Sequence, residues 1–259
     1  MRTTKEILAF INELYPLTNA SDFDKGKVGM QFGSQDAKVK KVILALDTTI
    51  EVVDEAILQG ANLIISHHPF MFAPLLNLDY DSPFGKKLLK VMKNELNIMA
   101  FHTNFDVAED GMNDTLANLL DLKDIHYITN EINPDAFLRV GSTSTTLEEL
   151  IKKVKKVYHQ DAVNYVGSLN KQINSVGIVG GSGSSEFYEA LNAGCDVFIT
   201  GQIPHHLGLE AKYYDMALIE VSHAVEFFGV KHLKEVLEQK FPDVEFILSS
   251  VDADPFKIM

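Results

Sequence analysis

The chain has 259 residues, a formal net charge of −13 and 46% hydrophobic residues. This length is enough for one large domain or two smaller ones. An acidic surface repels phosphate backbones, so the charge disfavours a general nucleic-acid-binding protein. A small anionic substrate stays open, because bound metal ions can reverse the charge locally.

Nothing in the sequence indicates a membrane or a secreted protein. It has no run of about 18 apolar residues, and the N-terminal segment lacks the apolar core of a signal peptide. The single cysteine, Cys195, cannot form an internal disulfide. We therefore expect a cytoplasmic protein.

The first half of the chain predicts alternating strands and helices. Thr3 and Glu6 form a capping-box pattern at the start of a helix over 3–15, and a loop rich in Gly and Asp is expected over 20–35. The next predicted elements are a strand at 42–46, a helix from Thr48 to Leu58, a strand at 62–65, a helix at 83–94, a strand at 98–101 and a helix at 113–120.

The second half continues this alternation after an internal boundary around 130–135. The predicted strands are 137–140, 162–166, 175–179, 197–200, 217–221 and 244–248, and the helices are 145–158, 185–192, 207–213 and 224–239. This order predicts an α/β fold of two α/β/α layered domains with mostly parallel or mixed sheets. The expected domains are 1–128, completed by 222–259, and 129–221.

Six of the nine histidines lie at or just after the end of a predicted strand. Parallel α/β sheets build their sites at the carboxyl ends of strands, so these side chains can converge although they are far apart in sequence. The clustering predicts a site at the strand ends. The six are His67, His68, His102, His205, His206 and His223.

His67 and His68 are adjacent at the end of an apolar strand. Neighbours in an extended segment point to opposite sides, so the pair could serve two metal ions rather than chelate one. The alternative is a pair of partly exposed histidines at the entrance to a loop.

Two further segments carry ligand-type residues. Asp106 offers a hard carboxylate ligand, and the nearby His102 could be a ligand, an acid–base group or a hydrogen-bond donor to a ligand. The alternative is that Asn104 and Asp106 only shape a turn. His223 and Glu226 are three residues apart at a helix start, where they can bind one ion from one face or belong to an ordinary amphipathic helix.

Weaker features leave more than one interpretation open. The segment 180–185, GGSGSS, fits an anion-binding nest at a helix start or a tight turn without a ligand. Asp47 could reach the strand-end site or cap the next helix. His206 could face the site while His205 faces solvent, and Cys195 is expected to be a core residue rather than a nucleophile.

Taken together, these segments resemble the NIF-three-like dinuclear metal proteins, also called GTP cyclohydrolase type-two homologues. The matching segments follow the family's order over nearly the whole chain. They are VGMQFG (28–33), ISHHPF (65–70), HTNFD (102–106), GGSGSS (180–185), ITGQIPHH (199–206) and SHAVE (222–226).

The resemblance implies a pair of divalent metal ions held by His67, His68, Asp106, His223 and Glu226, with the glutamate bridging them. It also implies a toroidal homohexamer whose sites face an internal cavity. The chain departs from the family pattern in two places. It has no tryptophan, and it carries Ser-His-Ala at 222–224 where relatives usually have Gly-His-Tyr or similar.

The resemblance leaves three functions open. The first is a GTP cyclohydrolase type of purine ring opening, with His102 or His206 moving protons. The second is phosphoester hydrolysis of a nucleotide at the same pair of metals, distinguished by phosphate rather than formate as product. The third is a metal-binding or interaction scaffold without turnover. Mixed histidine and carboxylate ligands suit zinc, iron, manganese or nickel.

Overall fold

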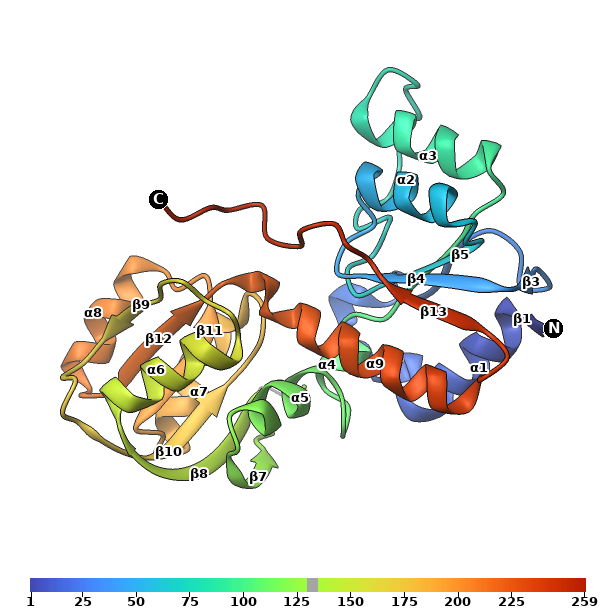
Figure 1. Ribbon diagram of the computed structural model, residues 1–259. Coiled ribbons are helices and arrows are strands. Elements are labelled where there is room, and N and C mark those ends of the chain that lie inside the picture. The colour runs from blue at the N-terminus through green and yellow to red at the C-terminus, as the bar shows by residue number, and fades with distance from the viewer. Residues whose placement is uncertain (130–134) are drawn as a thin grey trace. The chain divides into compact units, whose positions relative to one another are not determined.

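A computed structural model describes residues 1–129 and 135–259, and the chain divides into two compact units. The first unit comprises Met1–Phe105 and Val230–Ala253, and the second comprises Asp106–Gly229 and Asp254–Met259. Both units are α/β structures (Figure 1). Most of the boundary that the sequence indicated near residues 130–135 falls outside the described residues.

The first unit contains a five-stranded mixed sheet. The spatial order is β13 (Glu245–Leu248), β4 (Lys41–Ala45), β5 (Leu63–Ser66), β6 (Asn97–Ala100) and β2 (Gly29–Phe32). The parallel strands were predicted from their apolar runs. In contrast, β2 lies within the segment 20–35 that was predicted to be a loop, and it pairs antiparallel with β6.

Helices cover both faces of this sheet (Figure 1). On one face α2 (Ile50–Gln59) and α3 (Pro83–Lys93) pack on alternate strand residues such as Ile43 and Ile64, and together they form a buried core. On the other face lie α1 (Thr4–Leu14) and α9 (Phe227–Lys240), the latter beginning in the second unit. Continuous apolar strands fit a sheet buried on two faces.

The helix ends follow the sequence signals closely. Thr3 and Glu6 form the predicted capping box of α1. The side chain of Thr49, rather than the predicted Thr48, caps α2 by accepting a hydrogen bond from the Val52 N–H. Gly60 ends α2 with φ 67°, a left-handed conformation that glycine adopts without steric cost.

The second unit contains a six-stranded sheet with parallel strands in its interior and antiparallel strands at its edges. The pairs β10–β11 and β11–β12 are parallel, whereas β7, β8 and β9 are joined antiparallel. The spatial order is β7 (Lys123–Tyr127), β8 (Arg139–Thr146), β10 (Gln172–Ile178), β11 (Val197–Gly201), β12 (Ala217–Val221) and β9 (Asn164–Val166).

Two buried cores flank this second sheet. One contains α5 (Met112–Leu119) and α6 (Leu147–Val157), and the other contains α7 (Phe187–Asn192) and α8 (His205–Tyr213). Because α5 packs in this core and β7 pairs with β8, residues 106–128 group with the second unit. The predicted first domain, which ran to residue 128 and resumed at 222, divided the chain differently.

The remaining elements are short. They are β1 (Arg2–Thr3) paired with β3 (Lys38–Val39), the 3-10 helices η1 (Leu17–Asn19), η2 (Asp22–Asp24), η3 (Gly183–Glu186) and η4 (His223–Glu226), and the single turn α4 (Thr103–Asp106). Among the described residues, no helix is long and apolar enough to cross a membrane.

Because Cys195 is buried, we expect the free energy of unfolding of the protein to depend on pH. Burial raises the pKa of its thiol from 9.0 to about 11. The folded chain therefore keeps this proton over a range in which the unfolded chain loses it, so stability falls as pH rises from 9 to 11. The loss attributable to Cys195 should approach about 2–3 kcal/mol.

Urea unfolding of the parent and of Cys195→Ala at about pH 8 and about pH 10.5 measures this contribution. The stability lost between the two pH values should be smaller in Cys195→Ala, which cannot titrate at this position. Equal losses in the two proteins would contradict the shifted thiol.

Candidate metal centre

Three histidines of the first unit gather at the carboxyl ends of neighbouring parallel strands. His67 and His68 follow β5, and His102 follows β6. One ligand nitrogen from each of the three lies within 4.8 Å of the others. The ring centroids of His67 and His102 are 5.1 Å apart, and those of His68 and His102 are 5.6 Å apart. Such a cluster can hold a metal ion.

Each of these rings is oriented by an acceptor at Nδ1. The His67 Nδ1 lies 2.9 Å from the Phe101 carbonyl oxygen, the His68 Nδ1 lies 2.9 Å from Asp47 Oδ1, and the His102 Nδ1 lies 2.8 Å from Asp24 Oδ2. A carbonyl or an ionised carboxylate can only accept, so each Nδ1 carries the proton. Nε2 is then the nitrogen with a lone pair, the tautomer that metal-binding histidines use.

Asp24 is a buried carboxylate that fixes the start of α4. Its Oδ2 accepts hydrogen bonds from His102 Nδ1 and from the Thr103 N–H and hydroxyl. Burial alone would raise the pKa of Asp24, but these hydrogen bonds, and the positive charge that His102 carries whenever it is protonated, lower it below its ordinary value. Asp24 therefore stays ionised and holds the His102 ring.

In the second unit, His223 and Glu226 occupy η4, directly after the end of β12. The Ser222 side chain caps this turn by accepting from the Ala224 N–H. His223 Nε2 lies 3.0 Å from Glu226 Oε2, and Glu226 is buried whereas His223 is partly exposed. The i, i+3 spacing thus places an imidazole and a carboxylate where both can bind the same cation.

Glycines let the neighbouring strand ends approach Glu226. Gly181 has φ 57°, and a Cβ there would lie 2.2 Å from Glu226 Oε1 and 3.1 Å from His223 Nε2. A Cβ on Gly201 would lie 2.7 Å from the Gly181 carbonyl oxygen, which already accepts the Gly201 N–H. Only glycine fits both positions without displacing a neighbour.

Asp106 is buried at the end of α4, and Asn113 ties its backbone to the glycine loop. The Asn113 side chain donates to the Asp106 carbonyl oxygen at 3.1 Å and accepts the Gly180 N–H at 2.8 Å. Gly183 N–H donates to the Thr200 hydroxyl. Because these two backbone N–H groups are already bonded within the protein, the tight-turn interpretation of GGSGSS is favoured over the anion nest.

The other predicted residues have different surroundings. His205 and His206 are exposed in the first turn of α8, and neither belongs to a cluster of potential metal ligands among the described residues. Asn104 donates from its side chain to the Tyr15 carbonyl oxygen, so it has a structural contact. Asp47 orients His68 instead of capping a helix.

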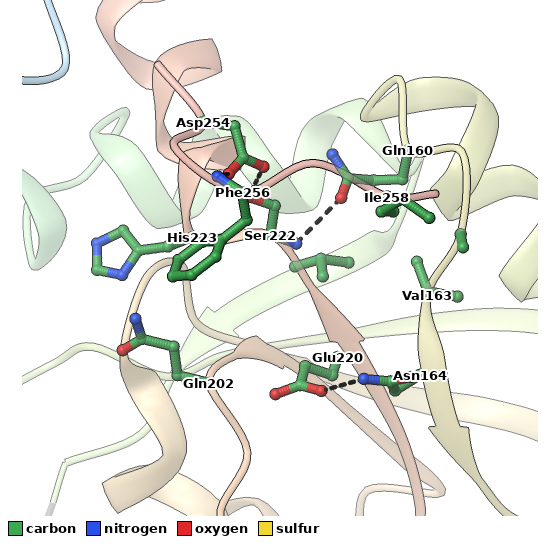
Figure 2. A pocket seen from close by; sticks show the side chains of 12 residues that line it. Gln160, Val163, Asn164, Gln202, Glu220, Ser222, His223, Asp254, Phe256 and Ile258 are labelled. Carbon is green, nitrogen blue, oxygen red and sulfur yellow. Dashed lines mark hydrogen bonds between the residues drawn. The ribbon is translucent and has the colours of Figure 1, made fainter. Parts of the chain in front are cut away.

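A pocket of about 510 Å³ opens in the second unit, beside the end of β12 (Figure 2). His223 and Phe256 contribute to its wall, and the C-terminal segment that carries Phe256 is tied down where the Asp254 carboxylate accepts the Ser222 hydroxyl. The other polar side chains at the wall are Gln160, Asn164, Gln202 and Glu220.

Sequence reasoning missed the residues that hold the candidate ligands in place. Asp24 is 78 positions from His102 and lies in a segment predicted to be a loop. Asn113 was assigned only to a helix, although both ends of its amide are used. The glycines at 181 and 201 were visible in the sequence, but the contact of Gly181 with Glu226 and that of the two glycines with each other were not.

Comparisons with known proteins agree with the motif resemblance. Residues 2–255 match the family model Duf34/NIF3 (NGG1p interacting factor 3). The chain is 32% identical to the GTP cyclohydrolase 1 type 2 homolog of Clostridium acetobutylicum, over 98% of this chain and 97% of that protein.

Solved structures give the same result. The chain resembles the Staphylococcus aureus hypothetical protein SA1388 with a TM-score of 0.92 and 29% identity, over 99% of each chain. It also resembles reduced HcgD from Methanocaldococcus jannaschii with a TM-score of 0.85 and 28% identity, over 96% of this chain and 98% of that one. The chain belongs to the DUF34/NIF3 family.

Proposed function

We propose that this protein binds two divalent metal ions through His67, His68, Asp106, His223 and Glu226 and uses them to hydrolyse a small nucleotide-like molecule. GTP is the first substrate to consider, because the curated relatives are named GTP cyclohydrolase 1 type 2 homologs.

The observation that carries the proposal is the orientation of the adjacent His67 and His68. Each has Nδ1 bonded to an oxygen acceptor, which leaves Nε2 as the ligand atom. A metal-binding histidine typically donates its other ring N–H to a carboxylate or carbonyl oxygen in this way. His67 is also buried, where a bound cation would be shielded from competing water.

The two proposed carboxylate ligands add negative charge to the site. Two divalent ions are strongly positive, and the carboxylates of Asp106 and Glu226 offset part of that charge. Both carboxylates are buried, and Glu226 has an imidazole 3.0 Å away. Hard oxygen and imidazole nitrogen together suit zinc, iron or manganese.

When bound, such a pair of ions supplies Lewis acidity, lowering the pKa of water and stabilising developing negative charge. The chain must supply proton transfer. Of the two candidates, His102 is better placed than the exposed His206, because Asp24 fixes its ring within the histidine cluster. We assign His102 this role, with Asp24 as the positioning residue.

Filling the space beside Glu226 with an added side chain tests whether His223 and Glu226 bind metal. Gly181→Ala should weaken divalent-metal binding by about 10–100-fold, because the new Cβ forces the carboxylate to turn away. Gly194→Ala is the matched control, since Gly194 also has a positive φ but a Cβ added there would meet nothing within 4 Å.

Competition with a chelator measures the metal affinity of both variants. Both should lose about 1 kcal/mol of stability from backbone strain, and only Gly181→Ala should lose metal. Unchanged metal affinity in Gly181→Ala would argue against Glu226 as a ligand.

The catalytic part of the proposal is tested by product analysis with GTP. Chelator-treated protein should be inactive, and reloading with zinc, iron or manganese should restore release of formate. Release of phosphate instead would indicate phosphoester hydrolysis. Metal-independent turnover would contradict the proposal, and bound metal without any product would leave a metal-binding scaffold.

We further propose that the chain self-associates, as the homohexamer implied by the motif resemblance. Five large apolar side chains are exposed in one loop after His68, an arrangement that isolated chains rarely leave in water. Light scattering should give about six times the chain mass of 28.9 kDa, and a monomer would contradict the proposal. The five are Phe72, Leu75, Leu76, Leu78 and Tyr80.

A further inference from the structure

The pocket of the second unit has a wall chemistry that the metal ligands do not explain. Among the described residues that line it, none is a lysine or an arginine. Its charged side chains are the carboxylates of Glu220 and Asp254, with His223 at one edge. A wall of this kind repels phosphate groups and favours an uncharged ligand rich in hydrogen-bond donors.

Glu220 is held on β12 by hydrogen bonds to both oxygens of its carboxylate. Its Oε1 accepts the Ile203 N–H at 2.7 Å, and its Oε2 accepts the Asn164 side-chain amide at 2.7 Å (Figure 2). Each carboxylate oxygen has a second acceptor position. A planar ligand with two adjacent N–H groups could therefore bind Glu220 in a bidentate manner.

Phe256 gives the wall an aromatic surface. Phe256 is 77% exposed, although large aromatic side chains usually bury most of their area. Its segment is fixed, because the Asp254 carboxylate accepts the Ser222 hydroxyl and also the Phe256 N–H. An exposed ring on an anchored segment provides a platform on which a nucleobase can stack.

The wall also contains a strained residue. Gln202 has φ 56°, a left-handed conformation that is uncommon outside glycine, and it lies directly after β11. Its side chain is exposed at the pocket, near His223 in Figure 2. Strained backbone of this kind is typical of ligand-binding positions.

We propose that this pocket binds the guanine base of the nucleotide substrate, with Glu220 accepting its N–H groups and Phe256 stacking on its face. The choice of guanine rests on the proposed function. Guanine presents a ring N–H and an exocyclic amino group side by side, the pattern that a carboxylate accepts. Inosine keeps the ring N–H but lacks the amino group. A comparison of guanosine with inosine therefore separates the contact of the amino group with Glu220 from the stacking on Phe256.

Calorimetric titration of guanosine and inosine into the chelator-treated full-length protein tests the pocket without metal or phosphate. Guanosine should bind about tenfold more tightly than inosine. Glu220→Gln should remove most of this difference, and Phe256→Ala should weaken both nucleosides by about tenfold. Tyr213→Ala, which removes an exposed aromatic ring elsewhere in the same unit, should change neither affinity.

Undetectable guanosine binding to a folded parent, or equal affinity in the parent, Glu220→Gln and Phe256→Ala, would overturn the proposal. The metal-loaded proteins then separate it from the proposed function. Metal-dependent product from GTP with an unchanged KM in both variants keeps the function and overturns the guanine pocket. Guanosine binding that the variants weaken, without product from GTP, keeps the pocket and overturns the function.

Discussion

Replacing both His67 and His68 with alanine is expected to remove nearly all bound divalent metal from the chain. The two imidazoles are adjacent proposed ligands, and the contacts of their Nδ1 atoms with the Phe101 carbonyl oxygen and with Asp47 leave Nε2 as the ligand atom. Loss of two ligands lowers affinity far more than loss of one residue that positions a ligand, which itself costs about 10–100-fold. Elemental analysis after gel filtration measures the metal retained per chain.

His126→Ala is the control for this double variant. His126 is exposed on β7, its ring nitrogen contacts the nearby Asp124 carbonyl oxygen, and it belongs to no cluster of potential metal ligands among the described residues, so its loss should leave the metal content unchanged. A folded double variant that keeps the metal content of the parent would show that these histidines are not ligands.

Arg139→Met is expected to destabilise the protein by about 3–5 kcal/mol, the usual cost of breaking a buried ion pair from one side. Arg139 is 1% exposed, and its guanidinium donates to the Asp114 carboxylate and to three backbone carbonyl oxygens. Two of these carbonyls belong to Val107 and Ala108, so Arg139 also holds the segment after Asp106.

Urea unfolding measures this loss, with Lys152→Met as the control. Lys152 forms an exposed i, i+4 pair with Glu148, and such pairs contribute only about 0.3–0.5 kcal/mol. A change below about 1 kcal/mol for Arg139→Met would contradict the importance of the buried guanidinium.

The fold was predicted best where one short segment carries a complete signal. The apolar run at β12 was assigned to the correct residues, and the capping box of α1 and the left-handed Gly60 gave correct helix ends. The prediction of a loop over 20–35 was wrong in part, because β2 forms a strand only by pairing with β6, which lies far along the chain. Edge strands of this kind have weak local signals.

The sheet that residues 123–127 join was harder to predict for the same reason. Residues 123–127 have little apolar character and are mostly exposed, so nothing local marks them as β7. Their strand identity comes from pairing with β8, and their place in the second unit follows from that contact. Composition cannot reveal a boundary that depends on which sheet a segment joins.

The clustering of strand-end histidines was predicted from the sequence, whereas the residues that orient them were not. Parallel strands place His67, His68 and His102 at one sheet edge, and this arrangement follows from strand-end positions alone. The buried Asp24 and the bridging Asn113 lie far from their partners in sequence. Hydrogen bonds between distant segments leave no periodic pattern from which they could be predicted.

The most direct test of the dinuclear metal proposal is the number of metal ions per chain. Elemental analysis should be done on protein purified without added metal, and again after chelation and reloading with zinc, iron or manganese. We predict about two ions per chain in at least one of these states. Negligible metal in every state would contradict the account and leave the histidines as a strand-end cluster without a bound cation.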